Sequence, residues 1–356
     1  MTSEIAENRF IEHLVAGFAR SPLQLNLLHE SDSEILRLPA DQDRILAFTT
    51  DSIAEEIEVG LYHDPYLIGW MTTMVNMSDL AAVGASPIGI LISEIFPPET
   101  SREFIDLIQK GIADSCQACS AFVLGGDTNA GPNLVLTGSA LGVANRGEYM
   151  KRVGITAGDV VYATGLLGAG NAFALAEYMR RQQRTFPPFR FQPTARLREG
   201  LTMARLASAC MDTSDGVLST LDQLMRLNQV GFEIEIPCES LLLPTARLVS
   251  EQAAIPPWLL LAGEHGEFEL LFTVSPANEQ ALLAEMAHRG YMPLRLGRAI
   301  AETTIRMNLH GHMTDLDTCT IRNLACVCGT DIETYIRELC SIDRETKKGA
   351  LSYVNC

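Results

Sequence analysis

Short apolar runs that lead into small residues and an aspartate recur along the chain, and they limit its fold more than any other feature. Residues 45–49 lead to Asp51, and residues 121–124 lead into Gly-Gly-Asp-Thr at 125–128. We predict that both runs are buried strands that end in polar turns. Apolar residues follow helical spacing between them, at residues 66–85 and 101–119. Strands and helices in this mixed order predict an α/β or α+β fold.

The length of 356 residues favours two domains over one or three. Polar residues interrupt the apolar pattern at 145–149, so we expect a first domain at 1–147 and a second at 148–330. Residues 331–356 mix acidic and basic side chains. We expect them to form a helix and a polar tail that the core does not need.

The charge balance excludes several classes of partner. The chain has 27 basic and 44 acidic residues and a net charge of -17, which argues against a surface for nucleic acid or anionic membranes.

The longest uncharged run, residues 160–176, contains three glycines, so we predict no membrane span. The N-terminal residues are acidic where a signal peptide is basic, and we therefore expect a cytoplasmic protein.

Aspartates beside Thr, Ser or Gly are the candidate functional residues, and all six are candidate metal ligands: Asp32, Asp51, Asp79, Asp127, Asp212 and Asp215. Small neighbours allow a highly charged ligand to approach the backbone, and carboxylates suit Mg²⁺. Each aspartate could instead be a helix cap or a turn former. However, residues 45–101 contain eight acids and no Lys or Arg. Asp51 and Asp79 thus lack a basic partner nearby in sequence, and a metal ion is the simplest cation to supply.

The motifs together resemble the thiamine-monophosphate kinase family of the AIR synthase related, PurM-like superfamily. The resemblance covers roughly residues 20–300 and rests on motifs in a fixed order: Thr49-Thr50-Asp51, residues 69–85, Gly125-Gly126-Asp127-Thr128, Arg152-Val153-Gly154, residues 158–165, Pro193 with Arg196, Asp212-Thr213-Ser214-Asp215-Gly216, and residues 269–273. It implies a two-domain PurM-like fold whose N-terminal domain pairs in a homodimer. It also implies ATP and Mg²⁺ as cofactors and transfer of the γ-phosphoryl group of ATP to thiamine monophosphate, which requires positioning more than a strong base.

The resemblance also assigns roles to individual residues. The six aspartates would hold metal ions, and Asp212 and Asp215 would be the catalytic pair. Five residues would bind the nucleotide: Thr50, Gly126, Asp127, Thr128 and Arg152.

Departures from the family pattern gather at positions that face the second substrate. The kinase's Gly-Asp-Asp stretch aligns with Glu30-Ser31-Asp32, so Ser31 replaces one expected metal carboxylate. Residues 55–59 lack the family's histidine, and we expect Glu55, Glu56 and Glu58 to form a solvated face. The segment at 264–269 replaces Gly-Gly-Glu-Asp-Tyr-Glu, which makes His265, Glu267 and Phe268 candidate substrate residues. His265 could equally be structural or solvated.

Two other functions stay open at this stage. The chain could use ATP to activate a carbonyl or amide oxygen of another substrate, as hydrogenase maturation enzymes do with a C-terminal cysteine, and this chain ends in Cys356. It could also be a non-catalytic paralogue that binds nucleotide without turnover, since Ser31 replaces an acid.

Overall fold

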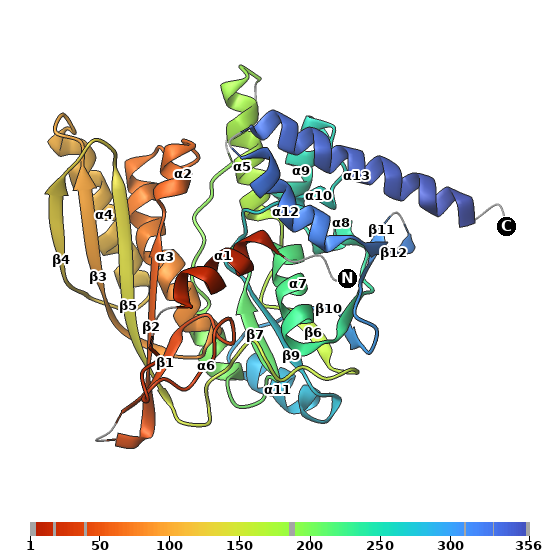
Figure 1. Ribbon diagram of the computed structural model, residues 1–356, viewed down its shortest axis with the longest axis horizontal. Coiled ribbons are helices and arrows are strands. Elements are labelled where there is room, and N and C mark those ends of the chain that lie inside the picture. The colour runs from red at the N-terminus through yellow and green to blue at the C-terminus, as the bar shows by residue number, and fades with distance from the viewer. Residues whose placement is uncertain are drawn as a thin grey trace.

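The structure is a computed structural model that describes residues 5–16, 19–38, 41–184, 189–309, 311–329 and 331–353, with side chains up to residue 344. Cys356, the candidate carrier thiol, lies outside these residues. The described chain forms two sheets with helices packed on them, which confirms the predicted mixed α/β class (Figure 1).

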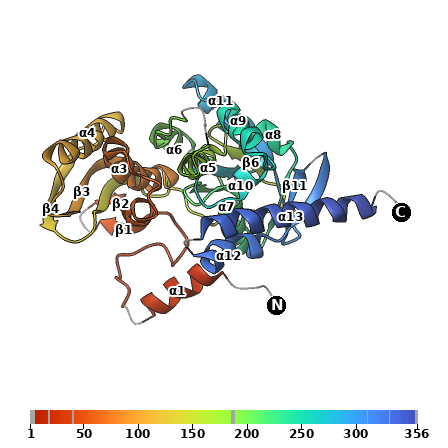
Figure 2. The same cartoon turned by 90° about the horizontal axis from the view of Figure 1, so that it is seen from above.

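The first sheet has the strand order β1-β2-β5-β3-β4. Its strands are β1 (Glu34–Leu38), β2 (Asp41–Ser52), β3 (Ser86–Phe96), β4 (Val123–Ala130) and β5 (Val135–Asn145). They pair antiparallel except for β3 and β4, which are parallel. Three helices belong to this part of the chain: α2 (Ala54–Glu58), α3 (Pro65–Ala82) and α4 (Arg102–Ala118). Figure 2 shows α3 and α4 along one side of this sheet.

The second sheet has the order β12-β11-β8-β10-β6-β9-β7. Its strands are β6 (Val160–Ala163), β7 (Ala209–Asp212), β8 (Gly231–Ile234), β9 (Leu270–Val274), β10 (Leu294–Ile300), β11 (Ile305–Leu309) and β12 (His312–Leu316). The other helices are α1 (Ala6–Val15), α5 (Ala169–Arg181), α6 (Leu197–Met203), α7 (Val217–Asn228), α8 (Cys238–Leu241), α9 (Pro244–Ala253), α10 (Leu259–Ala262), α11 (Pro276–His288), α12 (Thr318–Cys328) and α13 (Ile332–Tyr353). The predicted domain boundary at residue 147 falls between the two sheets, and the two-domain division remains our proposal.

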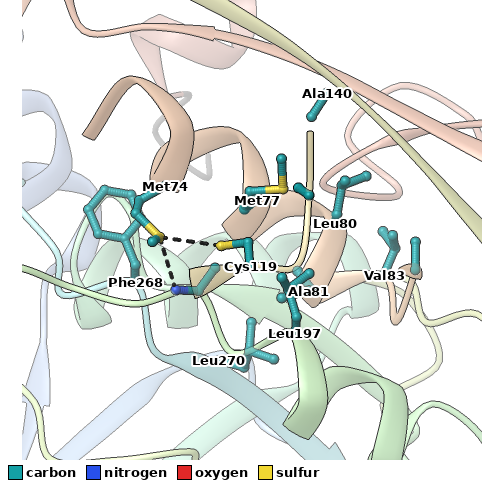
Figure 3. Packing of buried hydrophobic residues seen from close by; sticks show 14 of the residues in the cluster. Met74, Met77, Leu80, Ala81, Val83, Cys119, Ala140, Leu197, Phe268 and Leu270 are labelled. Atoms are coloured by element: carbon teal, nitrogen blue, oxygen red, sulfur yellow. Dashed lines mark hydrogen bonds between the residues drawn. The ribbon is translucent and has the colours of Figure 1, made fainter. Parts of the chain in front are cut away.

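Helix α3 connects the two halves of the molecule. It is buried on almost all sides, as expected for a helix whose only charged residue is Asp79. One side packs against α4, where Gly69 and Gly111 permit close contact because a Cβ on either would overlap the other helix's backbone. Met74 lies near Phe268 of the second half, and its sulfur accepts a hydrogen bond from the backbone N–H of Ala195 at 3.4 Å (Figure 3). This packing fixes Asp79 relative to both sheets.

Two sequence predictions about local structure were wrong. Gly-Gly-Asp-Thr at 125–128 is not a turn after a buried strand, because it lies inside β4, and β4 is exposed along its whole length. The reason is that β4 is the edge strand of the first sheet and pairs with β3 alone.

The helix from residue 332 is also not dispensable. Leu339 belongs to the second core, and the buried Trp258 donates a hydrogen bond from Nε1 to Asp343 at 2.7 Å.

Among the described helices, none combines the length and the apolar character that crossing a membrane requires.

Candidate functional site

Three aspartates from distant parts of the chain form a carboxylate cluster. Asp32 precedes β1, Asp79 lies in the last turn of α3, and Asp212 ends β7. Each offers one ligand atom, and these atoms lie within 4.8 Å of one another. Three oxygen ligands at such separations suit a hard divalent cation. The cluster thus joins three of the six predicted metal ligands, and it requires both halves of the molecule.

Hydroxyl groups from the same motifs hold these carboxylates in place. Thr49 donates a hydrogen bond to Oδ2 of Asp79. Ser78 donates to Oδ2 of Asp212 at 2.5 Å, and Ser214 donates to its Oδ1 at 2.9 Å. The small residues around the aspartates therefore orient the carboxylates as well as leaving room for a ligand.

Arg152 is the basic residue paired with the cluster. Its Nη2 donates to Oδ1 of Asp32 at 2.8 Å, while the buried Oδ2 of Asp32 has no hydrogen-bond partner. One guanidinium faces three carboxylates here, so the site is short of positive charge. The orphaned oxygen fits a metal ligand better than a structural salt bridge.

The raised pKa values of the aspartates in and beside the cluster reflect the same shortage of positive charge. Burial and the charge of Asp32 raise the pKa of Asp212 to about 7. Burial, then the charges of Asp51, Asp212 and Asp32, raise the pKa of Asp79 well above its usual value. Desolvation is also the main cause that raises the pKa of Asp51, to about 6, and the charge of Asp215 adds to it. A divalent cation among these groups would favour their ionised forms.

These pKa directions predict how stability depends on pH without metal. A carboxylate whose pKa is higher in the folded than in the unfolded state stabilises the fold fully at low pH, and that contribution is lost as pH rises through the folded pKa. For Asp212 the loss begins above the usual aspartate pKa of 3.8 and continues through the folded pKa of about 7. We expect the metal-free protein to melt about 2 °C lower at pH 8 than at pH 6.

Thermal denaturation with and without Mg²⁺ tests this prediction. Mg²⁺ should raise the melting temperature more at pH 8 than at pH 6, because the ligands must be deprotonated to bind it. Asp106→Asn is the matched control, since Asp106 is an exposed acid on α4 whose carboxylate lies near the exposed Arg102. A melting temperature that is insensitive to Mg²⁺ at both pH values would contradict a metal site here.

An acidic cavity of about 190 Å³ adjoins the cluster. Asp51 and Asp215 line it, together with Glu56, Glu264 and His265. Its walls come from both halves of the molecule, and Arg181 links them because its Nη1 donates to the carbonyl of Val59 at 2.7 Å. The cavity therefore offers space for a ligand beside the carboxylate cluster.

Glu56 and Glu264 are cavity residues that sequence reasoning missed. Glu56 was expected on a solvated face, but its Oε2 is buried without a hydrogen-bond partner and it lines the acidic cavity. Burial, then the charges of Glu55, Asp215 and other acids, raise the pKa of Glu264 to about 7. The absence of Lys and Arg from residues 45–101 was the one available signal for Glu56.

The predicted nucleotide residues on the first sheet do not all face the cluster. Asp51 of β2 and Gly126 of β4 are in register with each other across β5 and β3. Asp127 lies one residue further along β4. Because side chains alternate along a strand, Asp127 and Thr50 point to the face opposite Asp51, and β4 is about 14 Å from β2. Thr128 faces the helices and contacts Glu94 at 3.4 Å. Within one chain, then, Asp127 stands apart from the carboxylate cluster.

The three predicted substrate residues differ in their surroundings. His265 lines the acidic cavity, and burial lowers its pKa to about 4, so its ring is neutral at physiological pH. Phe268 lines the same cavity. Glu267 is buried, and its carboxylate accepts hydrogen bonds from Gly168 N–H at 2.6 Å and Thr213 Oγ1 at 3.0 Å. Glu267 thus ties two loops together in this structure.

Comparison with known protein families gives this geometry a context. The family model of the AIR synthase related protein, N-terminal domain, matches residues 30–144, and that of the C-terminal domain matches residues 156–310. The chain belongs to the AIR synthase related family. Within this family it is similar to thiamine-monophosphate kinases. The protein from Synechococcus elongatus is 30% identical over 293 residues, which cover 78% of this chain and 85% of that relative.

Solved structures of AIR synthase related proteins share the fold. Thiamine-monophosphate kinase from Stenotrophomonas maltophilia has a TM-score of 0.64 at 25% identity and covers 85% of this chain and 97% of that one. The structure of AaThiL complexed with AMPPCP and TMP has a TM-score of 0.68 at 22% identity and covers 85% of this chain and 92% of that one. These matches confirm the predicted PurM-like fold.

Proposed function

We propose that the protein is an ATP- and Mg²⁺-dependent kinase that phosphorylates thiamine monophosphate to the diphosphate. The observation that carries this proposal is the carboxylate cluster of Asp32, Asp79 and Asp212, which lies beside an acidic cavity. The chain is about 30% identical to a thiamine-monophosphate kinase over most of its length, and this similarity supports the same reaction. Activation of a carbonyl or amide oxygen is not favoured, since these relatives are kinases.

The residues of the cluster fit Mg²⁺, because they supply hard oxygen ligands and one of these oxygens is buried without a partner. We propose that Asp32, Asp79 and Asp212 hold the metal, with Asp51 and Asp215 contributing from the adjoining cavity. Bound Mg²⁺ would neutralise the triphosphate and allow two phosphate-bearing substrates to lie near acidic side chains.

The chain's own groups mainly position the reactants. Arg152 supplies a fixed positive charge beside Asp32, and Ser78 and Ser214 keep Asp212 oriented. In the transfer, a phosphate oxygen of thiamine monophosphate forms a bond to the γ-phosphorus while the bond from that phosphorus to the β-γ bridging oxygen breaks, and ADP leaves. The attacking phosphate oxygen is already ionised near pH 7, so no side chain has to remove its proton.

We also propose that the protein acts as a homodimer through the uncovered face and outer edge of the first sheet. This region exposes large apolar side chains, including Leu91, which is 50% exposed, and Phe122, which is 71% exposed. Apolar groups of this size usually mark an interface when they gather on one face. A second copy packed there would bring Asp127 and Thr50 of one chain towards the site of its partner.

A coupled assay of ADP release tests the proposed reaction with thiamine monophosphate, with thiamine and without an acceptor. We expect ADP only with thiamine monophosphate, and not with thiamine or without an acceptor. ADP release that does not depend on thiamine monophosphate would overturn the proposal, as would nucleotide binding without any turnover.

A further inference from the structure

Asn76 is a fully buried polar residue on α3, and its side chain contacts the end of β2. Its Oδ1 accepts a hydrogen bond from the backbone N–H of Asp51 at 3.1 Å, and its Nδ2 lies 3.5 Å from the carbonyl oxygen of the same residue. Nδ2 also donates to the carbonyl of Thr72, one turn earlier in α3, at 3.1 Å. The amide thus contacts both backbone polar groups of Asp51 and is itself held by the helix.

Gly138 of β5 leaves the room that this amide occupies. It pairs with Asp51 across the sheet, and a Cβ added to it would lie 2.4 Å from Nδ2 of Asn76. A side chain at residue 138 would therefore push the amide away from β2. Glycine inside a strand often marks a close approach of this kind. The helix and the two strands are thus fitted together at the point where Asp51 lies.

The same helix carries Asp79 of the carboxylate cluster. Asn76 and Asp79 are three residues apart and lie on one side of α3, and Thr49 and Asp51 likewise share one face of β2. Thr49 donates to Asp79. Asn76 holds the backbone of Asp51. Two hydrogen-bonded contacts therefore join the end of β2 to the last turns of α3, and together they fix how far Asp51 lies from Asp79.

We propose that Asn76 is a positioning residue for phosphoryl transfer, because its amide keeps Asp51 at the distance from Asp79 at which both carboxylates can hold the metal-bound nucleotide. This inference rests on the proposed function, in which the two aspartates act through Mg²⁺. Hydrogen bonds within a protein add little net stability, since the unfolded chain makes similar bonds to water. The geometric effect is larger, because a displacement of about 1 Å can reduce the rate of an enzyme about a hundredfold.

Asn76→Ala tests the proposal through the requirement for Mg²⁺. We expect the Mg²⁺ concentration at half-maximal activity to rise about tenfold to a hundredfold, which is typical of losing a group that orients a metal ligand. The KM for thiamine monophosphate should change less than twofold. The Mg²⁺ concentration that gives half of the maximal increase in melting temperature should rise in parallel, and this second measurement needs no turnover.

Asn308→Ala is the matched control for these measurements. Asn308 is a half-buried amide on β11, away from the cluster, and it donates to the carbonyl of Glu235 at 3.0 Å. Its loss removes an amide hydrogen bond of the same kind, so the variant should change neither Mg²⁺ concentration.

Gly138→Ala tests the same contact with Asn76 in place, and it also serves if Asn76→Ala does not fold. The added methyl group should displace the amide, so we expect a similar rise in the Mg²⁺ requirement. When Gly138→Ala is combined with Asn76→Ala, the methyl group no longer meets the amide, and the double variant should be no worse than the more impaired single variant. If the two effects multiply, or if either folded single variant keeps the wild-type Mg²⁺ requirement, the inference is wrong.

The melting measurements separate failure of this inference from failure of the proposed function. If Mg²⁺ stabilises a wild type that does not phosphorylate thiamine monophosphate, the function is wrong, and the Mg²⁺ concentration that stabilises Asn76→Ala still decides the role of Asn76. If the wild type phosphorylates thiamine monophosphate and the folded variants need no more Mg²⁺, the role of Asn76 is wrong and the kinase function stands. A wild-type melting temperature that does not respond to Mg²⁺ would overturn the inference together with the metal site.

Discussion

Asp79→Asn is expected to reduce phosphoryl transfer at least a thousandfold while the protein remains folded. Asp79 is the acid that α3 places beside Asp32 and Asp212, so the substitution removes one of the three ligands of the proposed metal site. Loss of metal-held charge at a phosphoryl-transfer site costs several kcal/mol of transition-state stabilisation. Steady-state kinetics at saturating ATP and Mg²⁺ give the decrease directly.

The thermal stability of this variant separates a lost site from a lost fold. Without metal, Asp79→Asn should melt at or above the wild-type temperature, because it removes a buried carboxylate whose pKa is raised by its neighbours. The increase in melting temperature caused by Mg²⁺ should become much smaller. Asp106→Asn on α4 should leave activity and melting unchanged, because Asp106 is exposed. A variant at Asp79 that retains more than a tenth of the activity would contradict the assigned metal site.

Leu91→Arg is expected to convert the protein to a monomer and to reduce activity at least a hundredfold. Leu91 lies on β3 in the uncovered face of the first sheet, and a charge there would be buried in the proposed interface. Sedimentation velocity gives the oligomeric state. Leu107→Arg is a matched control, because Leu107 is similarly exposed but lies on α4, on the other side of the sheet.

Mixing two inactive variants tests whether the partner completes the site. If Asp127 acts in the partner's site, a dimer of one Asp79→Asn chain and one Asp127→Asn chain contains one intact site. When the two variants are mixed in equal amounts and their subunits exchange freely, half of the dimers are mixed. Each mixed dimer has one intact site of two, so about a quarter of the wild-type activity should return. No recovery after proven exchange would place Asp127 in the site of its own chain.

The sequence identified the class of fold and the central aspartates because these depend on local patterns. Apolar runs, helical spacing and Asp-rich motifs are visible in a single chain, and α4 formed within one residue of both predicted ends, while α3 begins one residue before its predicted start. Sequence could not show that Asp32, Asp79 and Asp212 meet, because their contact depends on how α3 packs between the two sheets. The resemblance to a known family supplied that expectation.

The errors arose where tertiary contacts or the position of a strand in its sheet decide burial. Apolar residues in β4 suggested a buried strand, yet β4 lies at the edge of the first sheet and is exposed. Polar residues in α13 suggested a dispensable tail, yet Leu339 and Asp343 occupy the single buried side of that helix. Glu56 looked solvated because it lies in an acidic stretch, and the cavity that it lines forms only when distant segments pack together.

The fate of a labelled γ-phosphate tests the central claim most directly. The protein is incubated with ATP labelled in its γ-phosphate and with thiamine monophosphate, with Mg²⁺ or with excess EDTA, and the products are separated. The proposed function predicts one label in thiamine diphosphate for each ADP formed, and none with EDTA. Label that appears only as free phosphate, or transfer that continues in EDTA, would contradict the account of a metal-dependent kinase.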